Sequence, residues 1–513
     1  MNFLRIPIIA LIFFATDFAH ASLFVLHGKV VQSDGGYTQA YLIIENDTIV
    51  SIQQEKPDIL ETTTLVETEG FIFPGLIDLH THTTYNILPL WENAQSQFEN
   101  RFSWRKNEHY RTQFRAAYRA LTDPENGDRF KKSLLLFDEL QAVAGGTTLV
   151  QESRALDKDI DEFTKQILIR GTDYSEDLGL NNGKRILSVI DLFDYRKTMP
   201  PVPTKALESF GKLRDKGRLQ AYIPHLAEGR TGFLREHGYD DYSRREFEAF
   251  RNHPIFSDWE TTPKLPIALV HCSGIDPQND EHIEFLKRWN MGIIWSPVSN
   301  LLLYGDTLDV ETLIRKGIPI ALGSDWSPSG SKHVLDEARM ARFYLRTINA
   351  DVSDAAIFQM MTSASAKMID HPRLGALKEG NLADLFILED LEKNENPMNV
   401  LFDTPVENIK LVIVGGKAIY GERDLMSKFS EHIQNLPVLE GKSVENKTVY
   451  IDPLLDISIE KSLNDLETFL KEKFGIYRSN TLSSSDIKYQ HRIVALRLMI
   501  REFFEKNGDK KGE

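Results

Sequence analysis

Short apolar runs recur between residues 76 and 322, and longer stretches with helical apolar spacing separate them. Strands that alternate with helices in this way indicate repeated βα units and a parallel sheet. Seven runs are clear and an eighth, weaker one lies at residues 167–169. The clear runs are residues 76–79, 147–150, 186–190, 220–223, 267–270, 292–295 and 319–322. The pattern predicts an α/β fold with a (β/α)8 barrel over residues 71–375.

Four of these runs end in residues that can bind a metal or transfer a proton. His80 and His82 close the first run, two positions apart, so both imidazoles leave the strand on the same side. His225, His271 and Asp325 each follow a later run. In a parallel barrel all these strand ends meet at one mouth, where active sites lie.

Each of these residues alone has a structural explanation. A histidine at a strand end is more often a hydrogen-bonded core residue than a ligand, and an aspartate there often caps a helix. The set is harder to explain by coincidence, because four strands in order finish with such groups. A further carboxylate, Glu228, lies three residues beyond His225. The sequence therefore predicts a metal-dependent active site at the barrel mouth.

Several longer motifs resemble the amidohydrolase superfamily, in its branch of mononuclear deaminases, triazine hydrolases and imidazolonepropionase-like enzymes. The resemblance covers roughly residues 23–425. Its motifs are PGLIDLHTH (74–82), HLAEG (225–229), HCSGID (271–276), WSPVSNLLLYG (295–305), ALGSDWSPSG (321–330) and RLGALKEGNLADLFIL (373–388).

The resemblance implies one divalent metal, with Zn2+ favoured over Fe2+. Its ligands would be His80, His82, His225 and Asp325. Glu228, His271 and Asp325 would be catalytic around the attacking water. The expected reaction is hydrolysis of a non-peptide C–N bond by metal-activated water, as deamination or ring opening of a small cyclic amidine, amide or imidazolone.

Two alternatives stay open. One is a binuclear peptidase- or lactamase-like amidohydrolase that acts on small peptides or cyclic amides. Its bridging lysine is missing at the expected strand, which ends in Asp191, while Lys184 precedes that strand. The other is a barrel that binds a ligand without turnover, although such proteins lose metal ligands and this chain keeps the full set.

Substrate contacts are predicted at Tyr85, Ser299, Asn300 and Trp326, which follow the strands that carry the ligands. Structural capping explains Ser299 and Asn300 nearly as well. The connection over residues 85–139 is long and rich in aromatic and charged residues. It is either a cover over the site or a surface helix pair that packs on the barrel.

The flanks of the barrel predict accessory parts. Residues 22–70 and 376–425 are β-rich and would together form a small β-sandwich domain. Residues 426–513 predict a helical extension, which packs on its own barrel or forms a homodimer contact.

Residues 1–21 have the pattern of a signal peptide: a basic start, a short apolar run and a small-x-small cleavage site before Ser22. We expect a periplasmic or extracellular protein without a stable membrane anchor after cleavage. The single cysteine, Cys272, excludes an intrachain disulfide. A net charge of -15 gives no support to nucleic-acid binding, so the expected partner is a small-molecule substrate.

Overall fold

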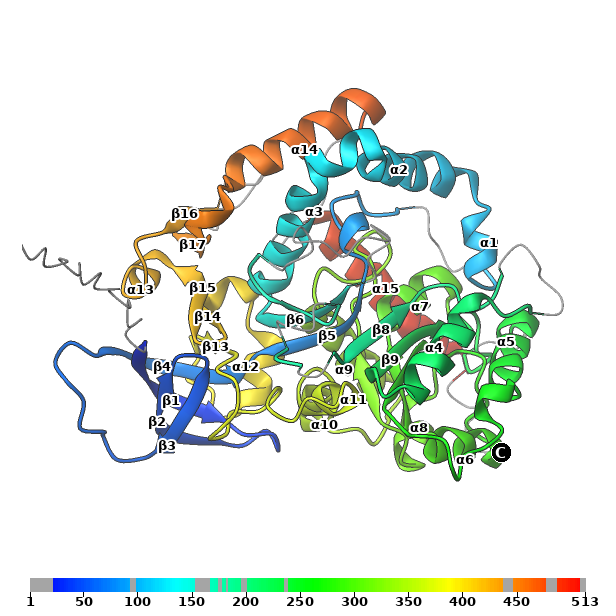
Figure 1. Ribbon diagram of the computed structural model, residues 1–513, viewed down its shortest axis with the longest axis horizontal. Helices are drawn as coiled ribbons and strands as arrows, with labels where there is room; N and C mark the ends of the chain where they lie inside the picture. Colours follow the sequence, from blue (N-terminus) through cyan, green and yellow to red (C-terminus); the bar gives the residue numbers. More distant parts are fainter. Residues whose placement is uncertain are drawn as a thin grey trace, which may run out of the picture.

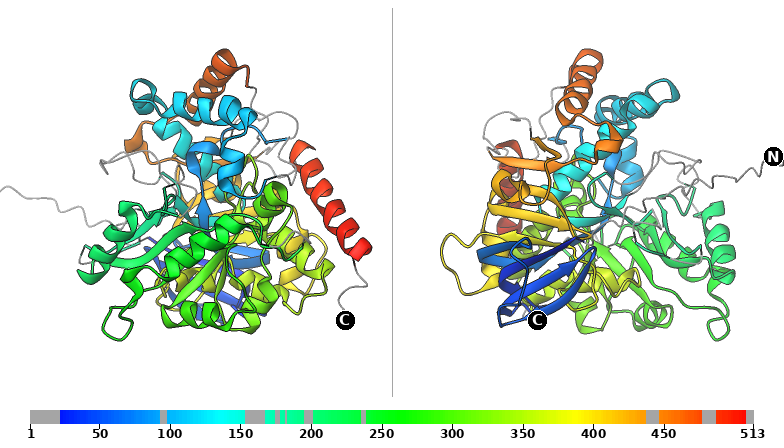
Figure 2. Two further views of the ribbon diagram at one scale, coloured as in Figure 1. Left: turned by 90° about the vertical axis from the view of Figure 1, so that its right-hand side faces the viewer. Right: turned by 60° about the vertical axis from the view of Figure 1, so that its left-hand side comes forward.

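The computed structural model describes most of the chain, and the predicted signal peptide at residues 1–21 lies outside the described residues. These are residues 22–92, 98–152, 167–173, 178–180, 183–194, 201–234, 239–436, 446–476 and 487–507. Figures 1 and 2 show a central body of strands and helices with a separate sheet at one side. Among the described residues, no helix is both long and apolar enough to cross a membrane.

Two parallel sheets form the middle of the described chain. Their strands are β5 (Leu76–Thr81), β6 (Thr147–Glu152), β7 (Arg170–Gly171), β8 (Arg185–Val189), β9 (Leu219–Leu226), β10 (Ile267–His271), β11 (Met291–Trp295) and β12 (Ile320–Leu322). The first sheet has the order β5-β6-β7 and the second β12-β11-β10-β9-β8. A parallel bridge between Thr81 and Asp325 joins the ends of the first and last strands. Each clear run thus coincides with a strand, and β7 begins one residue after the weaker run.

Helices follow the strands, as the alternation predicts. They are α3 (Pro124–Ala144), α4 (Lys205–Asp215), α5 (Asp241–Arg251), α6 (Asp280–Arg288), α7 (Pro297–Tyr304), α8 (Val310–Arg315), α9 (Val334–Thr347), α10 (Asp354–Gln359) and α11 (Ser363–Met368), with the 3-10 turn η4 (Pro254–Phe256). Side chains of Thr204, Asp240 and Asn279 accept hydrogen bonds from the first turns of α4, α5 and α6. Such caps satisfy backbone N–H groups that have no partner inside the helix.

The long first connection folds into short helices above β5. They are η1 (Thr83–Tyr85), α1 (Arg101–Arg105), the π-helix η2 (Tyr110–Arg115) and α2 (Ala116–Thr122). An asparagine before α1, Asn100, caps this helix with its side chain. These elements lie over the strand ends that carry the predicted ligands.

A nine-stranded sheet in the described part of the chain combines the two segments that flank the parallel sheets in the sequence. Its order is β16-β17-β15-β14-β13-β4-β1-β2-β3. The strands are β1 (Leu23–Val31), β2 (Tyr37–Glu45), β3 (Thr48–Gln53), β4 (Thr64–Pro74), β13 (Leu385–Leu388), β14 (Ile409–Val414), β15 (Lys417–Glu422), β16 (Ile433–Asn435) and β17 (Lys447–Tyr450). The pair β4 and β13 joins the flanks, and the sheet extends beyond residue 425, into the segment expected to be helical.

The C-terminal extension packs on the same chain. Its helices are α14 (Ile459–Phe474) and α15 (Ile487–Asn507), and short elements precede them: α12 (Pro397–Asp403), η5 (Val406–Asn408), α13 (Arg423–Met426) and η6 (Pro453–Leu455). Phe469 of α14 contacts Phe130 of α3, with ring centroids 4.8 Å apart. Arg492 of α15 donates hydrogen bonds to the carbonyls of Ser327 and Pro328. The extension therefore supports the loop that follows Asp325, and its role in a homodimer stays a prediction.

Candidate active site

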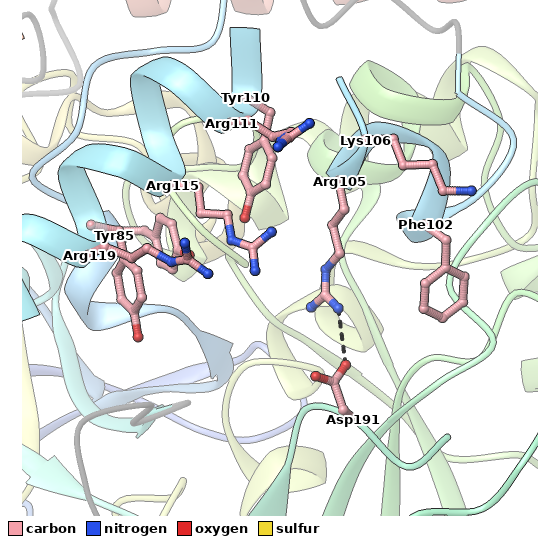
Figure 3. A pocket seen from close by; sticks show the side chains of 10 residues that line it. Tyr85, Phe102, Arg105, Lys106, Tyr110, Arg111, Arg115, Arg119 and Asp191 are labelled. Atoms are coloured by element: carbon pink, nitrogen blue, oxygen red, sulfur yellow. Dashed lines mark hydrogen bonds and ion pairs between the residues drawn. The ribbon is translucent and has the colours of Figure 1, made fainter. Parts of the chain in front are cut away.

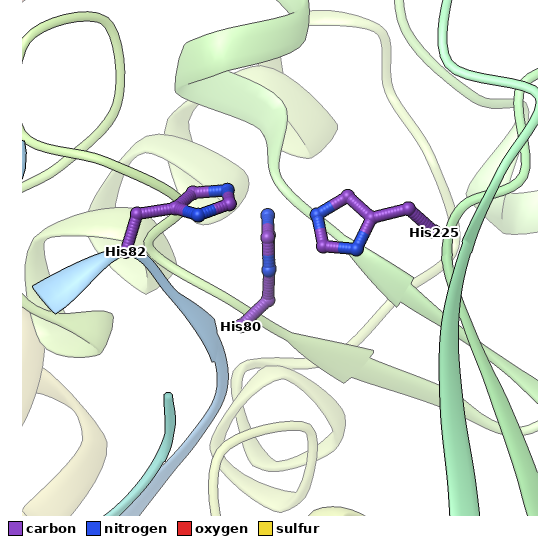
Figure 4. Close-up of side chains that lie close together, drawn as sticks. All are labelled: His80, His82 and His225. Carbon is purple, nitrogen blue, oxygen red and sulfur yellow. The ribbon is translucent and has the colours of Figure 1, made fainter. Parts of the chain in front are cut away.

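Three histidines from two strands converge at the mouth of the parallel sheets (Figure 4). His80 lies in β5, His82 follows that strand, and His225 is the penultimate residue of β9. The ring centroid of His80 lies 4.9 Å from that of His82 and 4.5 Å from that of His225. One nitrogen of each ring lies within 4.8 Å of the others. His80 and His82 thus lie close together, as their spacing of two residues predicts.

Asp325 completes this cluster from the loop after β12. Its Oδ1 lies 3.2 Å from Nε2 of His80 and 3.4 Å from Nε2 of His82. Gly323 allows the approach, because a Cβ there would lie 2.5 Å from the Cβ of His80. Asp325 adopts a left-handed φ of 62°, and His271 one of 63°. Backbone strain of this kind concentrates at functional sites.

The donor set fits a divalent cation. Both ring nitrogens of His80 and of His225 are buried and lack a hydrogen-bond partner. Burial lowers the pKa of His82 to about 3, and it also lowers the pKa of His225, with the neighbouring imidazoles adding to both effects. The imidazoles of His82 and His225 are thus neutral, which is the form that binds a metal. For Asp325, burial opposes ionisation, but His80, His271 and His82 outweigh it and hold the pKa below its usual range.

Glu228 and His271 lie together beside this cluster. The Oε2 of Glu228 is 3.8 Å from Nε2 of His271. Asn300 Nδ2 lies 3.3 Å from Nδ1 of His271. An amide nitrogen only donates, so this contact leaves the lone pair on Nδ1 and the proton of a neutral His271 on Nε2. Both groups are buried and can transfer or share a proton with a bound substrate.

Two further residues hold Glu228 in position, and no pattern in the sequence predicts this role for them. The hydroxyl of Tyr304, at the end of α7, donates to Oε1 of Glu228. Trp104 of α1 in turn donates from Nε1 to the Tyr304 hydroxyl at 2.9 Å. These two linked hydrogen bonds can be recognised only in the folded structure, because Trp104 and Tyr304 lie 200 residues apart in the sequence.

The predicted substrate contacts fall into two groups. Tyr85 and Trp326 line a cavity of about 210 Å³ above the cluster, together with His82, His225, Glu228 and Asp325. Ser299 instead donates a hydrogen bond to Oδ2 of Asp325, and Asn300 contacts His271. Ser299 and Asn300 are both buried and hold active-site groups in place, so a direct contact with substrate stays a prediction for them.

Trp326 lies at the centre of an aromatic wall built by the long first connection. Its ring stacks on Trp104 at 5.6 Å and meets the edge of Tyr85 at 5.3 Å. Trp104, Arg105, Tyr110 and Tyr118 of the same connection also line the cavity. The connection therefore covers the site mouth with side chains, as one of the two interpretations predicts.

Asp191, which follows β8 where the binuclear alternative expects a bridging lysine, forms ion pairs with arginines. It forms ion pairs with Arg101 and with Arg105, the latter at 3.1 Å. These two guanidinium groups outweigh burial and hold the pKa of Asp191 below its usual range. Lys184 is exposed before the start of β8. A carboxylate held by two arginines is a poor bridge between two metal ions, which favours one metal over two.

Glu246, in α5, provides a pH-dependent prediction for stability. Its Oε2 is buried without a partner, and burial raises its pKa from 4.5 to about 7. The folded state therefore holds this proton more tightly than the unfolded state, so the free energy of unfolding falls as the pH rises from about 4.5 to 7. At pH 8 we expect Glu246→Gln to be more stable than the wild type by up to about 3 kcal/mol. Urea titrations of both proteins at pH 5 and pH 8 measure this, and equal differences at the two pH values would contradict it.

Comparisons with known proteins agree with this geometry. The amidohydrolase family matches residues 234–420. A 5-methylthioadenosine/S-adenosylhomocysteine deaminase of Caldanaerobacter subterraneus subsp. tengcongensis is 23% identical over 415 residues, which cover 76% of this chain and 90% of that protein.

Solved structures show the same fold at low identity. A guanine deaminase from C. acetobutylicum, with guanine bound, superposes with a TM-score of 0.51 at 18% identity and covers 77% of this chain and 99% of its own. An atrazine chlorohydrolase from Arthrobacter aurescens, complexed with zinc, has a TM-score of 0.57 at 15% identity and covers 87% of this chain and 100% of its own.

Proposed function

We propose that this chain, which belongs to the amidohydrolase family, is a metal-dependent hydrolase that cleaves a non-peptide C–N bond. The observation that carries the proposal is the convergence of three buried histidines and Asp325, with Glu228 and His271 beside them. Deamination of a flat nitrogen heterocycle is the form of the reaction that we favour, because relatives and similar structures are deaminases. Trp326 and Tyr85 offer aromatic faces for such a ring.

His80, His82, His225 and Asp325 would hold the metal, and Zn2+ suits three imidazoles and one carboxylate. Zinc in the similar atrazine chlorohydrolase supports this choice. When bound, the metal lowers the pKa of a water to about 7 and so provides the nucleophile at neutral pH.

The side chains around the water divide the proton transfers. Asp325, held by Ser299, takes up a proton from the attacking water. The Nε2 proton of His271 stabilises negative charge on the oxygen that joins the carbon. Glu228, oriented by Tyr304, delivers its proton to the departing nitrogen, and the proton that Asp325 took up is returned to Glu228 before the next turnover. The C–N bond breaks, and either ammonia leaves or, for a ring nitrogen, the ring opens.

The proposal also covers the fold and the location of the protein. We propose that the two parallel sheets form one (β/α)8 barrel, which the bridge between Thr81 and Asp325 and the parallel pairing of consecutive strands support. The flanking sheet would be the small β-sandwich domain that accompanies it. Export to the periplasm or the medium, after cleavage before Ser22, also remains part of the proposal and rests on residues 1–21.

A screen for released ammonia tests the function. Zinc-loaded protein is incubated with aminopurines, aminopyrimidines, aminotriazines and imidazolones, and ring opening is followed by absorbance. We expect release or ring opening for at least one of these classes. Turnover of dipeptides or lactams, with none of the heterocycles hydrolysed, would contradict the proposal and favour the peptidase-like alternative.

A further inference from the structure

A second cavity, of about 660 Å³, adjoins the first, and Figure 3 shows side chains that line it. We call the first the inner cavity and this one the outer cavity. The two cavities share Tyr85, Arg105, Tyr110, Tyr118 and Asp191 as lining residues. A ligand that places its reacting atom beside the metal cluster therefore has room to extend outward. The first connection, which the proposed reaction uses only through Trp104 and Tyr85, forms most of the walls of this outer cavity.

The outer cavity is strongly cationic. Its lining contains five basic side chains, Arg105, Lys106, Arg111, Arg115 and Arg119. Its one acidic lining residue, Asp191, is already paired with Arg105 and with Arg101. The whole chain carries a net charge of -15, so this cluster of positive charge has the opposite sign to the protein as a whole.

Arg111, Arg115 and Arg119 form one row, which we call the arginine row. They are four residues apart along η2 and α2, so their side chains leave the helix on one face. In Figure 3 the guanidinium group of Arg115 points into the same space as that of Arg105. Among the described residues, no carboxylate lies within 4.0 Å of the arginine row.

A solvated helix face is the plain explanation for an arginine row, but the surroundings argue against it. Like charges at a spacing of four destabilise a helix, and exposed helices usually alternate their charges. Here all three arginines line a cavity that shares five lining residues with the cavity at the metal cluster, and three tyrosines lie on its walls. Guanidinium groups bind carboxylate and phosphate through paired hydrogen bonds, and tyrosine hydroxyls add further donors.

We propose that the substrate carries a carboxylate or phosphate group at the end remote from the bond that is cleaved, and that the arginine row binds this group. The idea rests on the proposed hydrolase function for the position of the reacting end. It narrows the substrate class to anionic heterocycles, with the ring in the inner cavity near Trp326 and the anion in the outer one.

Anion binding is measured first on the metal-free full chain, so that the result does not depend on catalysis. The probes are inorganic phosphate and benzoate, titrated by calorimetry at low salt, and they distinguish the two anions. The test variant is Arg111→Gln/Arg115→Gln/Arg119→Gln. The matched control, Arg244→Gln/Arg245→Gln/Arg251→Gln, removes the same charge from α5.

We expect saturable binding of at least one probe by the wild type and the control. The affinity of the test variant for that probe should be weaker by about tenfold or more. Thermal unfolding verifies that the test variant folds, and Arg115→Gln alone replaces it if it does not. Equal affinities in the test variant and the wild type, or no binding of either probe by the wild type, would overturn the proposal.

Once a substrate class is known, matched neutral and carboxylate-bearing members give a second readout. We expect kcat/KM of the wild type to favour the acid, and the ratio of the two values to fall about tenfold in the arginine-row variant. An unchanged ratio would overturn the proposed role of the row. Failure of the hydrolase proposal would instead appear as no turnover of either member while the metal-free protein still binds the anion.

Discussion

Glu228→Gln is expected to lower kcat by about 10² to 10⁴, while the metal content stays that of the wild type. The substitution keeps the shape of the side chain and its acceptor for the Tyr304 hydroxyl, but it removes the proton that the leaving nitrogen needs. Glu228 does not belong to the group of candidate metal ligands, so we expect its replacement to leave metal binding unchanged. The measurement is kcat on an ammonia-releasing substrate, with elemental analysis of the same sample.

Glu67→Gln is the control, since this carboxylate is largely exposed and lies in β4 of the flanking sheet. It should change neither kcat nor the metal content. If Glu228→Gln retained the wild-type kcat, the assignment of Glu228 as the proton donor would be wrong. If the variant lost its metal, Glu228 would be a ligand instead.

His271→Gln is expected to lower kcat by about 10² to 10³ and to leave the metal bound. Its Nε2 proton lies on the side of Glu228, where charge develops on the attacked group. The geometry also permits another assignment, because His271, His80 and Asp325 form a second group of donors close enough to hold an ion. The variant separates the two roles. A bound metal with low kcat supports stabilisation of the oxygen, whereas loss of the metal shows that His271 is a ligand.

The positions of the proposed metal ligands follow from the sequence because they depend on local periodicity and on one topological rule. Alternation along β5 places His80 and His82 on one side, and the carboxyl ends of parallel strands meet at one mouth. His225 and Asp325, although about 100 residues apart, therefore reach the same cluster.

Contacts that support the site depend on exact three-dimensional placement and leave no periodic signal. Tyr304 reaches Glu228, 76 residues before it in the chain, and Trp104 reaches Tyr304 from a connection without a repeating pattern. The sequence predicts Ser299 as a substrate contact or a structural cap; its hydroxyl donates a hydrogen bond to Asp325, and the contact with substrate stays a prediction. The sequence places Ser299 after β11 and does not show which way its side chain turns.

The flanking sheet and the arginine row illustrate the same limit. The apolar runs predict strands on both flanks, but the pairing of β4 with β13 joins segments more than 300 residues apart. Arginines four residues apart along a helix normally indicate a solvated face. Only the cavity beneath Arg111, Arg115 and Arg119 gives the row another meaning.

Metal content per chain shows directly whether His80, His82, His225 and Asp325 hold one ion. Elemental analysis of the wild type and of Asp325→Ala, both reconstituted with zinc and desalted, gives the stoichiometry. We expect about one equivalent in the wild type and its loss in the variant, since Asp325 lies within 3.4 Å of both His80 and His82. Two equivalents in the wild type, or none after reconstitution, or full retention by Asp325→Ala would contradict it.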